Sequence, residues 1–365
     1  MKKMRCAKSS ARKQIEKLEL SSYQKVNNSF HKRMVFRTGV DSGFFVEMNC
    51  MVNGMLYCLV HKIKFQIYSE DANYGTGIGW TEYFQPFCDE VHDKFHRRFN
   101  FHKLPSWRRI LKMCKARKSF NPLAWKIKSV LKTAMGRLCV LWVYKRHVLL
   151  SQDVSIHPDI QYVIPELGID CSYTEAFGLL AKMVWRFQPE IMSKESLYKA
   201  ELKLPSLYDG IHLRGGDKIT EADLISATSI MHFINEKSHS CFFTLTDDYR
   251  MFERIRRNCP AIQFLTLCQP DERGYHHQQF MKTSLNSKKE AIIRLIISVD
   301  LLLKARSFLG SITTGPSVFI MKIRIDDPLV MAVDCPKALL ELSLSKTIGE
   351  RAVISKRVCA EKKLR

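Results

Sequence analysis

The second half of the chain alternates short apolar runs with amphipathic segments, and this pattern limits its fold more than any other feature. The apolar runs are typical of strands and lie at 208–214, 241–246, 261–267, 307–310 and 329–333. Segments with helical spacing separate them, at 221–236, 248–258, 288–306 and 315–324. Repeated strand–helix–strand units form a parallel sheet with right-handed crossovers. We therefore expect an α/β fold whose ligands bind beyond the carboxyl ends of the strands.

The first half begins with a similar unit. A strand at 34–37, a glycine-containing turn, a helix at 44–60 and a strand at 65–68 follow one another. Further helices are expected at 107–118, 123–143 and 172–192. A length of 365 residues suits two domains. We expect a basic arm at 1–30, an N-terminal α/β domain at 31–200 with a basic helical insertion at 94–147, a C-terminal Rossmann-like domain at 205–345, and a basic tail at 346–365.

Composition excludes several classes of protein. Hydrophobic residues make up 46% and charged residues 26%, which is ordinary for a globular protein. No apolar stretch reaches the roughly 18 residues that a membrane-spanning helix needs, and the N-terminus lacks the apolar core of a secretory signal. The twelve cysteines include no CxxC pair. We therefore expect a cytoplasmic location, reduced thiols and no zinc site.

The positive charge is concentrated in one block. The formal net charge is +22, and residues 94–147 contain 16 lysines and arginines but no acidic residue. Aromatic residues such as Trp107 and Trp125 are interleaved with these cations. Such a block indicates an anionic partner, and the pattern favours an anionic membrane surface over nucleic acid. A solvated helical insertion whose aromatic rings pack inward remains the alternative.

The strand at 208–214 ends in a group of residues suited to bind phosphate. His212 and Arg214 lie two residues apart at its tip, and Gly215 and Gly216 allow the backbone to approach a ligand. Arginine offers a planar fork of donors that matches phosphate oxygens, and the helix that follows presents free amides. The alternative is a strand-end turn with a solvated arginine.

Asp247 and Asp248 follow the next strand. Two acids at a strand tip could bind a metal, cap the following helix, or orient the basic residues of the first loop. Helix capping is the favoured interpretation.

Two later features fit the same ligand. Asp300 lies on an apolar helix and needs a partner, which is either the edge of a guanine base or a neighbouring basic residue. Thr313 and Thr314 belong to a loop rich in hydroxyls and glycine between a strand and a helix, where they could hold a diphosphate or only cap the helix.

In their order along the chain, these features resemble the α1,6-fucosyltransferases and related fucosyltransferases, including the bacterial nodulation enzymes. The family has an HxRxxDK motif followed by a glutamate, which are matched here by His212, Arg214, Asp217, Lys218 and Glu221. A TDD strand end, an acid in an apolar helix and a Ser/Thr-rich loop come later in the family, and they are matched by Thr246, Asp247, Asp248, Asp300, Thr313 and Thr314. The resemblance covers residues 208–324 and, loosely, 34–68, where the segment 43–49 is similar to the family's glycine-rich loop. Gly215 stands where the family usually has a second arginine.

The resemblance implies a GT-B fold, with two Rossmann-like domains facing a central cleft, and GDP-fucose as the donor. His212 and Asp300 would recognise guanine, and Arg214 with Thr314 would hold the β-phosphate. Glu221 would be the general base, assisted by Lys218. Further donor contacts would come from Gly43, Asn49, Gly216, Asp247 and Thr313. The family needs no metal, and we expect no other cofactor.

The sequence therefore predicts inverting transfer of fucose from GDP-fucose to a glycan, with a lipid-linked or cell-surface polysaccharide precursor as acceptor. The enzyme would lie in the cytoplasm and contact the inner face of the cell membrane through residues 94–147, without binding nucleic acid. Two alternatives stay open. One is a transferase that uses another GDP-sugar, and the other is a non-catalytic basic protein that binds membrane or nucleic acid.

Overall fold

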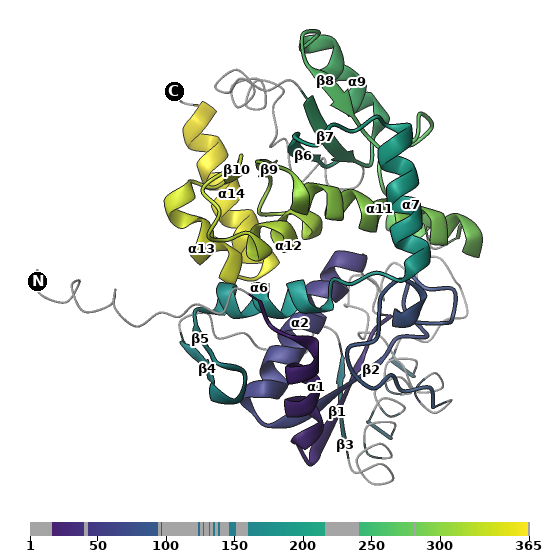
Figure 1. Ribbon diagram of the computed structural model, residues 1–365, viewed down its shortest axis with the longest axis vertical. Helices are drawn as coiled ribbons and strands as arrows, with labels where there is room; N and C mark the ends of the chain where they lie inside the picture. Colours follow the sequence, from purple (N-terminus) through teal and green to yellow (C-terminus); the bar gives the residue numbers. More distant parts are fainter. Residues whose placement is uncertain are drawn as a thin grey trace, which may run out of the picture.

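The computed structural model describes residues 17–39, 43–93, 96, 146–150, 160–215, 241–280 and 282–363, with seven helical positions between 123 and 138. Within these residues the chain forms two parallel sheets and one small antiparallel pair. In Figure 1 the three-stranded sheet occupies the lower half and the five-stranded sheet the upper half. The helices expected at 107–118 and 221–236 lie outside the described residues.

The five-stranded sheet has the order β10-β9-β6-β7-β8, and all its pairs are parallel. Its strands are β6 (Asp209–Leu213), β7 (Cys241–Thr246), β8 (Gln263–Leu265), β9 (Phe308–Gly310) and β10 (Val330–Ala332). From β6 in the centre the chain proceeds outward to β8, and it then returns to β9 on the other side. The boundary between β6 and β9 is therefore a topological switch point, where parallel sheets open a crevice for ligands.

Helices cover both faces of this sheet. They are α9 (Tyr249–Asn258), α10 (His277–Phe280), α11 (Leu285–Lys304), α12 (Gly315–Ile323), α13 (Lys337–Ser345) and α14 (Ile348–Lys363). Phe252 and Ile255 of α9 form one buried cluster with Ile211 and Leu213 of β6. Because strand side chains alternate, Gly210 and His212 face the other side, toward α11 and α12.

The N-terminal sheet has the order β2-β1-β3, again parallel. It comprises β1 (Lys32–Arg37), β2 (Ile63–Tyr68) and β3 (Arg146–Leu150), with α2 (Phe44–Val60) packed against it. Within the basic arm expected at 1–30, residues 20–29 form helix α1 (Leu20–Ser29). Asn27 of α1 exchanges two hydrogen bonds with the backbone of Phe65, at 3.0 and 2.7 Å, and so fixes the helix to β2.

The single helix expected at 172–192 is two helices, α6 (Tyr173–Val184) and α7 (Pro189–Glu201). Ser172 and Glu175 form a capping box at the start of α6. Pro189 lacks a backbone donor and suits only the first turn of a helix, so the chain breaks before it. The remaining short elements are η1 (Trp80–Glu82), β4 (Tyr162–Ile164), η2 (Pro165–Leu167) and β5 (Ile169–Cys171).

One hydrophobic core joins the two sheets. Helix α6 lies between them and packs against α2 on one side and α12 on the other (Figure 1). The rings of Phe45 on α2 and Phe319 on α12 lie 5.3 Å apart. Gly178 of α6 permits a close crossing, because a Cβ atom there would lie 2.9 Å from the carbonyl oxygen of Lys322.

The segment expected as a basic tail contributes helix α14, whose Ser355 is fully buried. Cysteines 50, 58, 88, 171, 241, 259, 268 and 335 are free thiols. Among the described helices, none combines the length and the apolar character that spanning a bilayer requires.

Candidate functional site

His212 lies at the switch point between β6 and β9. Its Nδ1 atom is 2.7 Å from the hydroxyl of Ser317 on α12 and 3.3 Å from the hydroxyl of Thr314, which precedes that helix. The strand alternation that turns Ile211 and Leu213 toward α9 turns His212 toward this loop. The tip of β6 and the start of α12, 102 residues apart at His212 and Thr314, are thus joined in one polar site.

The environment of His212 keeps its imidazole neutral. The side chain is buried, and this desolvation, reinforced by the positive charge of Arg214, lowers the pKa of His212 to about 3. A neutral imidazole offers one donor and one acceptor. His212 is therefore suited to hydrogen bonding with an uncharged polar group.

Asp334 stabilises the loop at 311–314, which follows β9. The carboxylate of Asp334 accepts hydrogen bonds from the Ser311 hydroxyl at 2.6 Å, the Ile312 amide at 3.0 Å and the Ser355 hydroxyl at 2.9 Å. The Ser311 hydroxyl in turn lies 2.7 Å from that of Thr313. Asp334 thus orients the loop that leads into the N-terminus of α12, where free amides favour an anion. The sequence analysis missed Asp334, because an acid after a short strand has no distinguishing pattern.

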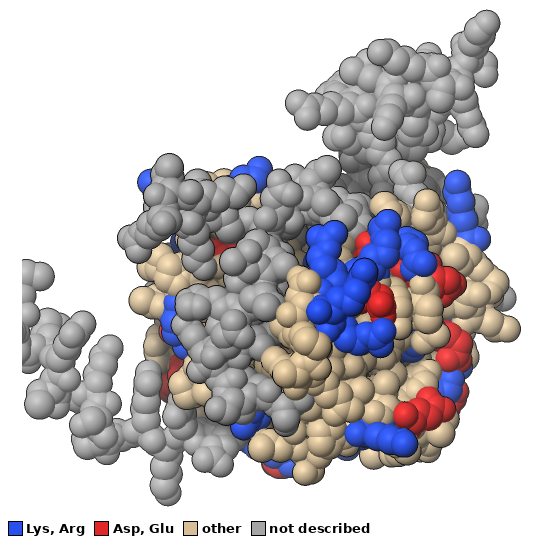
Figure 2. All heavy atoms as spheres, turned by 90° about the horizontal axis from the view of Figure 1, so that it is seen from above, with Lys and Arg blue, Asp and Glu red and all other residues tan. Residues whose placement is uncertain are grey.

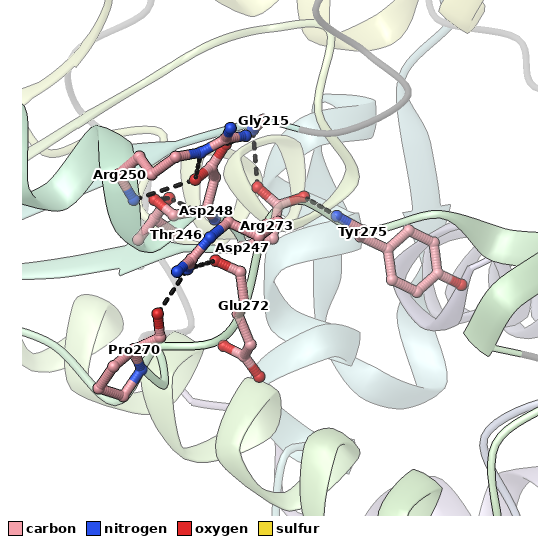
Figure 3. A network of polar contacts seen from close by, with 9 residues as sticks. All are labelled: Gly215, Thr246, Asp247, Asp248, Arg250, Pro270, Glu272, Arg273 and Tyr275. Carbon is pink, nitrogen blue, oxygen red and sulfur yellow. Dashed lines mark hydrogen bonds and ion pairs between the residues drawn. The ribbon is translucent and has the colours of Figure 1, made fainter.

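Arg214 is held by Asp247. The guanidinium forms an ion pair with the carboxylate of Asp247, which also accepts hydrogen bonds from the amides of Gly215 at 2.6 Å and Tyr275 at 2.9 Å. Figure 3 shows Asp247 between these two backbone segments. Of the roles considered for this acid, orientation of the first loop is the one that these contacts support.

Gly215 and Asp248 fit closely beside this pair. A Cβ atom on Gly215 would lie 2.9 Å from the Cβ atom of Asp248, so a side chain there would force the loop away from β7. Asp248 caps α9 by accepting from the amide of Arg250 at 3.0 Å, which confirms the capping interpretation. Its carboxylate also pairs with the Arg250 guanidinium at 2.8 Å.

Tyr275 is a second residue that the sequence analysis missed. The guanidinium of Arg214 stacks over its ring, 5.2 Å from the centroid. Tyr275 belongs to the segment between β8 and α11, and long loops of this kind often contribute to binding sites. That length is the signal by which the sequence could have indicated it.

Asp300 is engaged inside the protein. Its carboxylate accepts a hydrogen bond from the indole of Trp185 at 2.9 Å and forms an ion pair with Lys304 at 2.5 Å. Burial raises the pKa of Asp300, and the neighbouring Lys304 opposes the rise. Within the described residues, Asp300 forms no hydrogen bond or ion pair with His212 or Arg214. A guanine base bound here would have to replace the indole of Trp185.

The N-terminal half reaches the switch point through the start of α2. Gly43 precedes this helix, and a Cβ atom on Gly315 of α12 would lie 3.0 Å from the Cβ atom of Phe45. Asn49 lies further along α2, where its side-chain amide donates to the carbonyl of Phe45 at 2.5 Å. Phe45, two residues after Gly43, therefore lies against the start of α12, while the side-chain amide of Asn49 is used within its own helix.

Four residues of the first loop, Gly216, Asp217, Lys218 and Glu221, lie outside the described residues. The structure therefore brings together His212, Thr314 and Thr313 in one group, and Arg214 with Asp247 in an adjoining group. The two groups are close enough for Arg214 and Asp247 to act on the pKa of His212.

Comparisons with known proteins find similarity in structure only. No protein-family model and no curated protein sequence matches the chain. The fucosyltransferase NodZ from Bradyrhizobium is 14% identical, with 82% of this chain and 93% of that chain covered and a TM-score of 0.46. POFUT1 in complex with GDP is 11% identical, with 82% of this chain and 97% of that chain covered and a TM-score of 0.46. A mutant of Arabidopsis thaliana FUT1 in complex with GDP is 10% identical, with 83% of this chain and 73% of that chain covered and a TM-score of 0.43. At these identities and TM-scores, no residue role is transferred from these structures.

Proposed function

We propose that this chain is a glycosyltransferase that transfers fucose from GDP-fucose to a hydroxyl group of a glycan. The observation that most supports this is the switch point between β6 and β9. It combines a neutral His212, a hydroxyl-bearing loop at the start of α12, and an oriented Arg214. A nucleoside diphosphate needs both parts, because its base is uncharged and its phosphates are anionic.

The proposed reaction is a single displacement with inversion. Glu221 accepts the proton of the acceptor hydroxyl, whose oxygen forms the new bond to the anomeric carbon as the bond to GDP breaks. Arg214, with Thr313, Thr314 and the amides of α12, stabilises the negative charge on the departing diphosphate. Lys218 assists at the same loop. No metal takes part in this proposal.

The donor site is proposed to lie in a GT-B arrangement, with the N-terminal half on the acceptor side. His212 would hydrogen-bond the guanine base, and Gly43, Asn49 and Gly216 would line the donor cleft. Asp300 would contribute to guanine recognition only after giving up the hydrogen bond from Trp185.

The proposed acceptor is a lipid-linked or cell-surface polysaccharide precursor, with the basic block 94–147 against the inner face of the cell membrane. Helical positions within this block support membrane contact. Ile127, Leu131, Met135 and Leu138 repeat at intervals of three or four residues and are each at least half exposed. An exposed apolar row in a segment rich in lysine suits the interface of an anionic bilayer.

Calorimetric titration with GDP-fucose, GDP-mannose, GDP and UDP tests the proposal. We expect binding of GDP and GDP-fucose, loss of both in Arg214→Ala, and retained binding without turnover in Glu221→Gln. Turnover in Glu221→Gln would place the base elsewhere.

The same titration separates the alternatives. Preference for GDP-mannose would indicate a different GDP-sugar. The absence of heat with every guanine nucleotide would reject the transferase and leave a non-catalytic basic protein.

A further inference from the structure

Helix α9 presents a row of arginines on the outside of the molecule. Its ten residues contain four arginines and one glutamate. Arg250, Arg254 and Arg257 are spaced by four and three residues, which places them on one face of the helix, and all three are exposed. Figure 2 looks down on the end of the molecule where α9 lies and shows lysine and arginine side chains gathered in one patch.

The fold fixes the direction of this row. The opposite face of α9 carries Phe252 and Ile255, only 4% and 6% exposed, which pack on the sheet and prevent the helix from turning. Arg250 is paired with Asp248 and Arg256 with Glu253.

Two arginines of the row are left over. Within the described part of the chain, Arg254 and Arg257 form no ion pair with a carboxylate, and Arg257 donates only to the carbonyl of Glu253 at 3.3 Å. The row therefore keeps an excess of positive charge that is held toward solvent.

We propose that this arginine surface, consisting of Arg250, Arg254, Arg257 and Arg273, docks on the anionic headgroups of a membrane. Guanidinium groups bind phosphate and carboxylate oxygens through paired hydrogen bonds, and each cation near an anionic bilayer strengthens the attachment. The purpose of this docking, to hold the enzyme at a lipid-linked acceptor, rests on the proposed function, whereas the binding itself does not.

The chemistry of the surface favours a membrane over nucleic acid. Surfaces that bind single-stranded nucleic acid interleave cations with aromatic rings that stack on bases. On α9 the rings of Tyr249 and Phe252 lie 5.4 Å apart and pack on each other, and Phe252 is buried. Among the described residues of this helix, the arginine row therefore has no free aromatic ring on which a base could stack.

The surface begins at the rim of the candidate donor site. Arg250 pairs with Asp248, which also forms a bridge with the backbone of Arg273 and lies against Gly215. Docking through this surface would hold the rim beside the headgroups. An acceptor anchored in the same bilayer would then be presented at high local concentration.

Flotation of the full chain with vesicles tests the inference. We expect binding to vesicles of phosphatidylcholine with phosphatidylserine and not to phosphatidylcholine alone. The double variant R254E/R257E should bind at least about 30-fold more weakly, since each cation near the surface contributes on the order of fivefold. The matched control K356E/R357E makes the same change in charge at two exposed positions of α14.

Three results would overturn the inference: equal loss in both variants, no loss in R254E/R257E, or binding that persists when salt rises from about 0.1 M to about 1 M. Loss of binding to a single-stranded RNA without loss of vesicle binding would assign the surface to nucleic acid instead. GDP titration of R254E/R257E keeps the two proposals apart. Normal GDP binding with lost flotation supports docking, and failure of the wild-type chain to bind GDP rejects the proposed function alone.

Discussion

Two carboxylates that the sequence offered as ligand contacts lie in opposite environments. Asp247, at the tip of β7, joins Arg214, the Gly215 amide and the Tyr275 amide, so it links three segments at the edge of the sheet. Asp300, on α11, is bound by the indole of Trp185 and by Lys304. Lys304 also contacts Glu195 of α7 at 2.7 Å, so Asp300 belongs to a network between helices.

The comparison indicates that the donors around a carboxylate, and not its position in the sequence pattern, determine whether it shapes the site or stabilises the fold. The donors at Asp247 include an arginine and two loop amides, which together shape a strand-end loop. The donors at Asp300 belong to helices that hold the two halves together. A change at Asp247 should therefore affect ligand binding most, and a change at Asp300 should affect stability most.

The largest expected effect is that of Asp247→Ala on GDP binding. Removing the carboxylate abolishes the ion pair with Arg214 and the hydrogen bonds from the amides of Gly215 and Tyr275, and each such loss costs about 1–3 kcal/mol. We expect GDP affinity to fall about 100-fold in a calorimetric titration. Asp247→Asn, which keeps an acceptor but no charge, should lose about tenfold. If Asp247→Ala binds GDP as tightly as the wild type, the orientation of Arg214 is not needed for binding.

Asp300→Asn provides the opposite test. The amide oxygen still accepts from Trp185, but Lys304 loses one of its two charged partners in a half-buried setting. We expect the free energy of unfolding in urea to fall by about 1–3 kcal/mol, with GDP affinity changed less than about threefold. A large loss of GDP affinity at unchanged stability would instead assign Asp300 to guanine recognition and erase the contrast with Asp247.

The sequence could predict features that depend on neighbouring residues, but not those that depend on distant contacts. The limits of α2, β7 and α9 follow from local periodicity and capping, and the structure agrees with them to within a residue. The proposal that Arg214 binds phosphate rests on its chemistry and its place at a strand end. The partners of Asp300 could not be predicted, because Trp185 is 115 residues away and nothing local sets the direction in which the carboxylate points. Asp334 was missed for the same reason, since its importance comes from contacts that only the folded chain creates. Tyr275 differs, because the length of the loop that contains it is visible in the sequence.

His212 predicts a dependence of stability on pH at the switch point. Its pKa is about 3 in the folded chain and about 6.5 when unfolded, so the unfolded state takes up a proton first as the pH falls. The contribution of His212 is fully present above about pH 6.5 and decreases by about 1.4 kcal/mol per pH unit below that value, until the folded pKa is reached. Urea unfolding at several pH values should give a slope for wild type that exceeds that of His212→Gln by this amount. Parallel slopes would mean that His212 is protonated equally in both states.

The smallest expected effects compare a change in the loop after β9 with a change in helix α14, which supports that loop through Asp334. Ser355→Ala removes one of three hydrogen bonds to Asp334 and leaves those from Ser311 and Ile312 in place. It should cost about 1 kcal/mol of stability and leave GDP affinity within about twofold. Ser311→Ala should weaken GDP binding about fivefold, because the Ser311 hydroxyl also accepts from the Thr313 amide at 3.1 Å. If both variants weaken GDP binding equally, the hydrogen bond from Ser355 of α14 is needed for the geometry of the loop. The residues that determine GDP binding would then include α14 as well as the strand ends at which Asp247 lies.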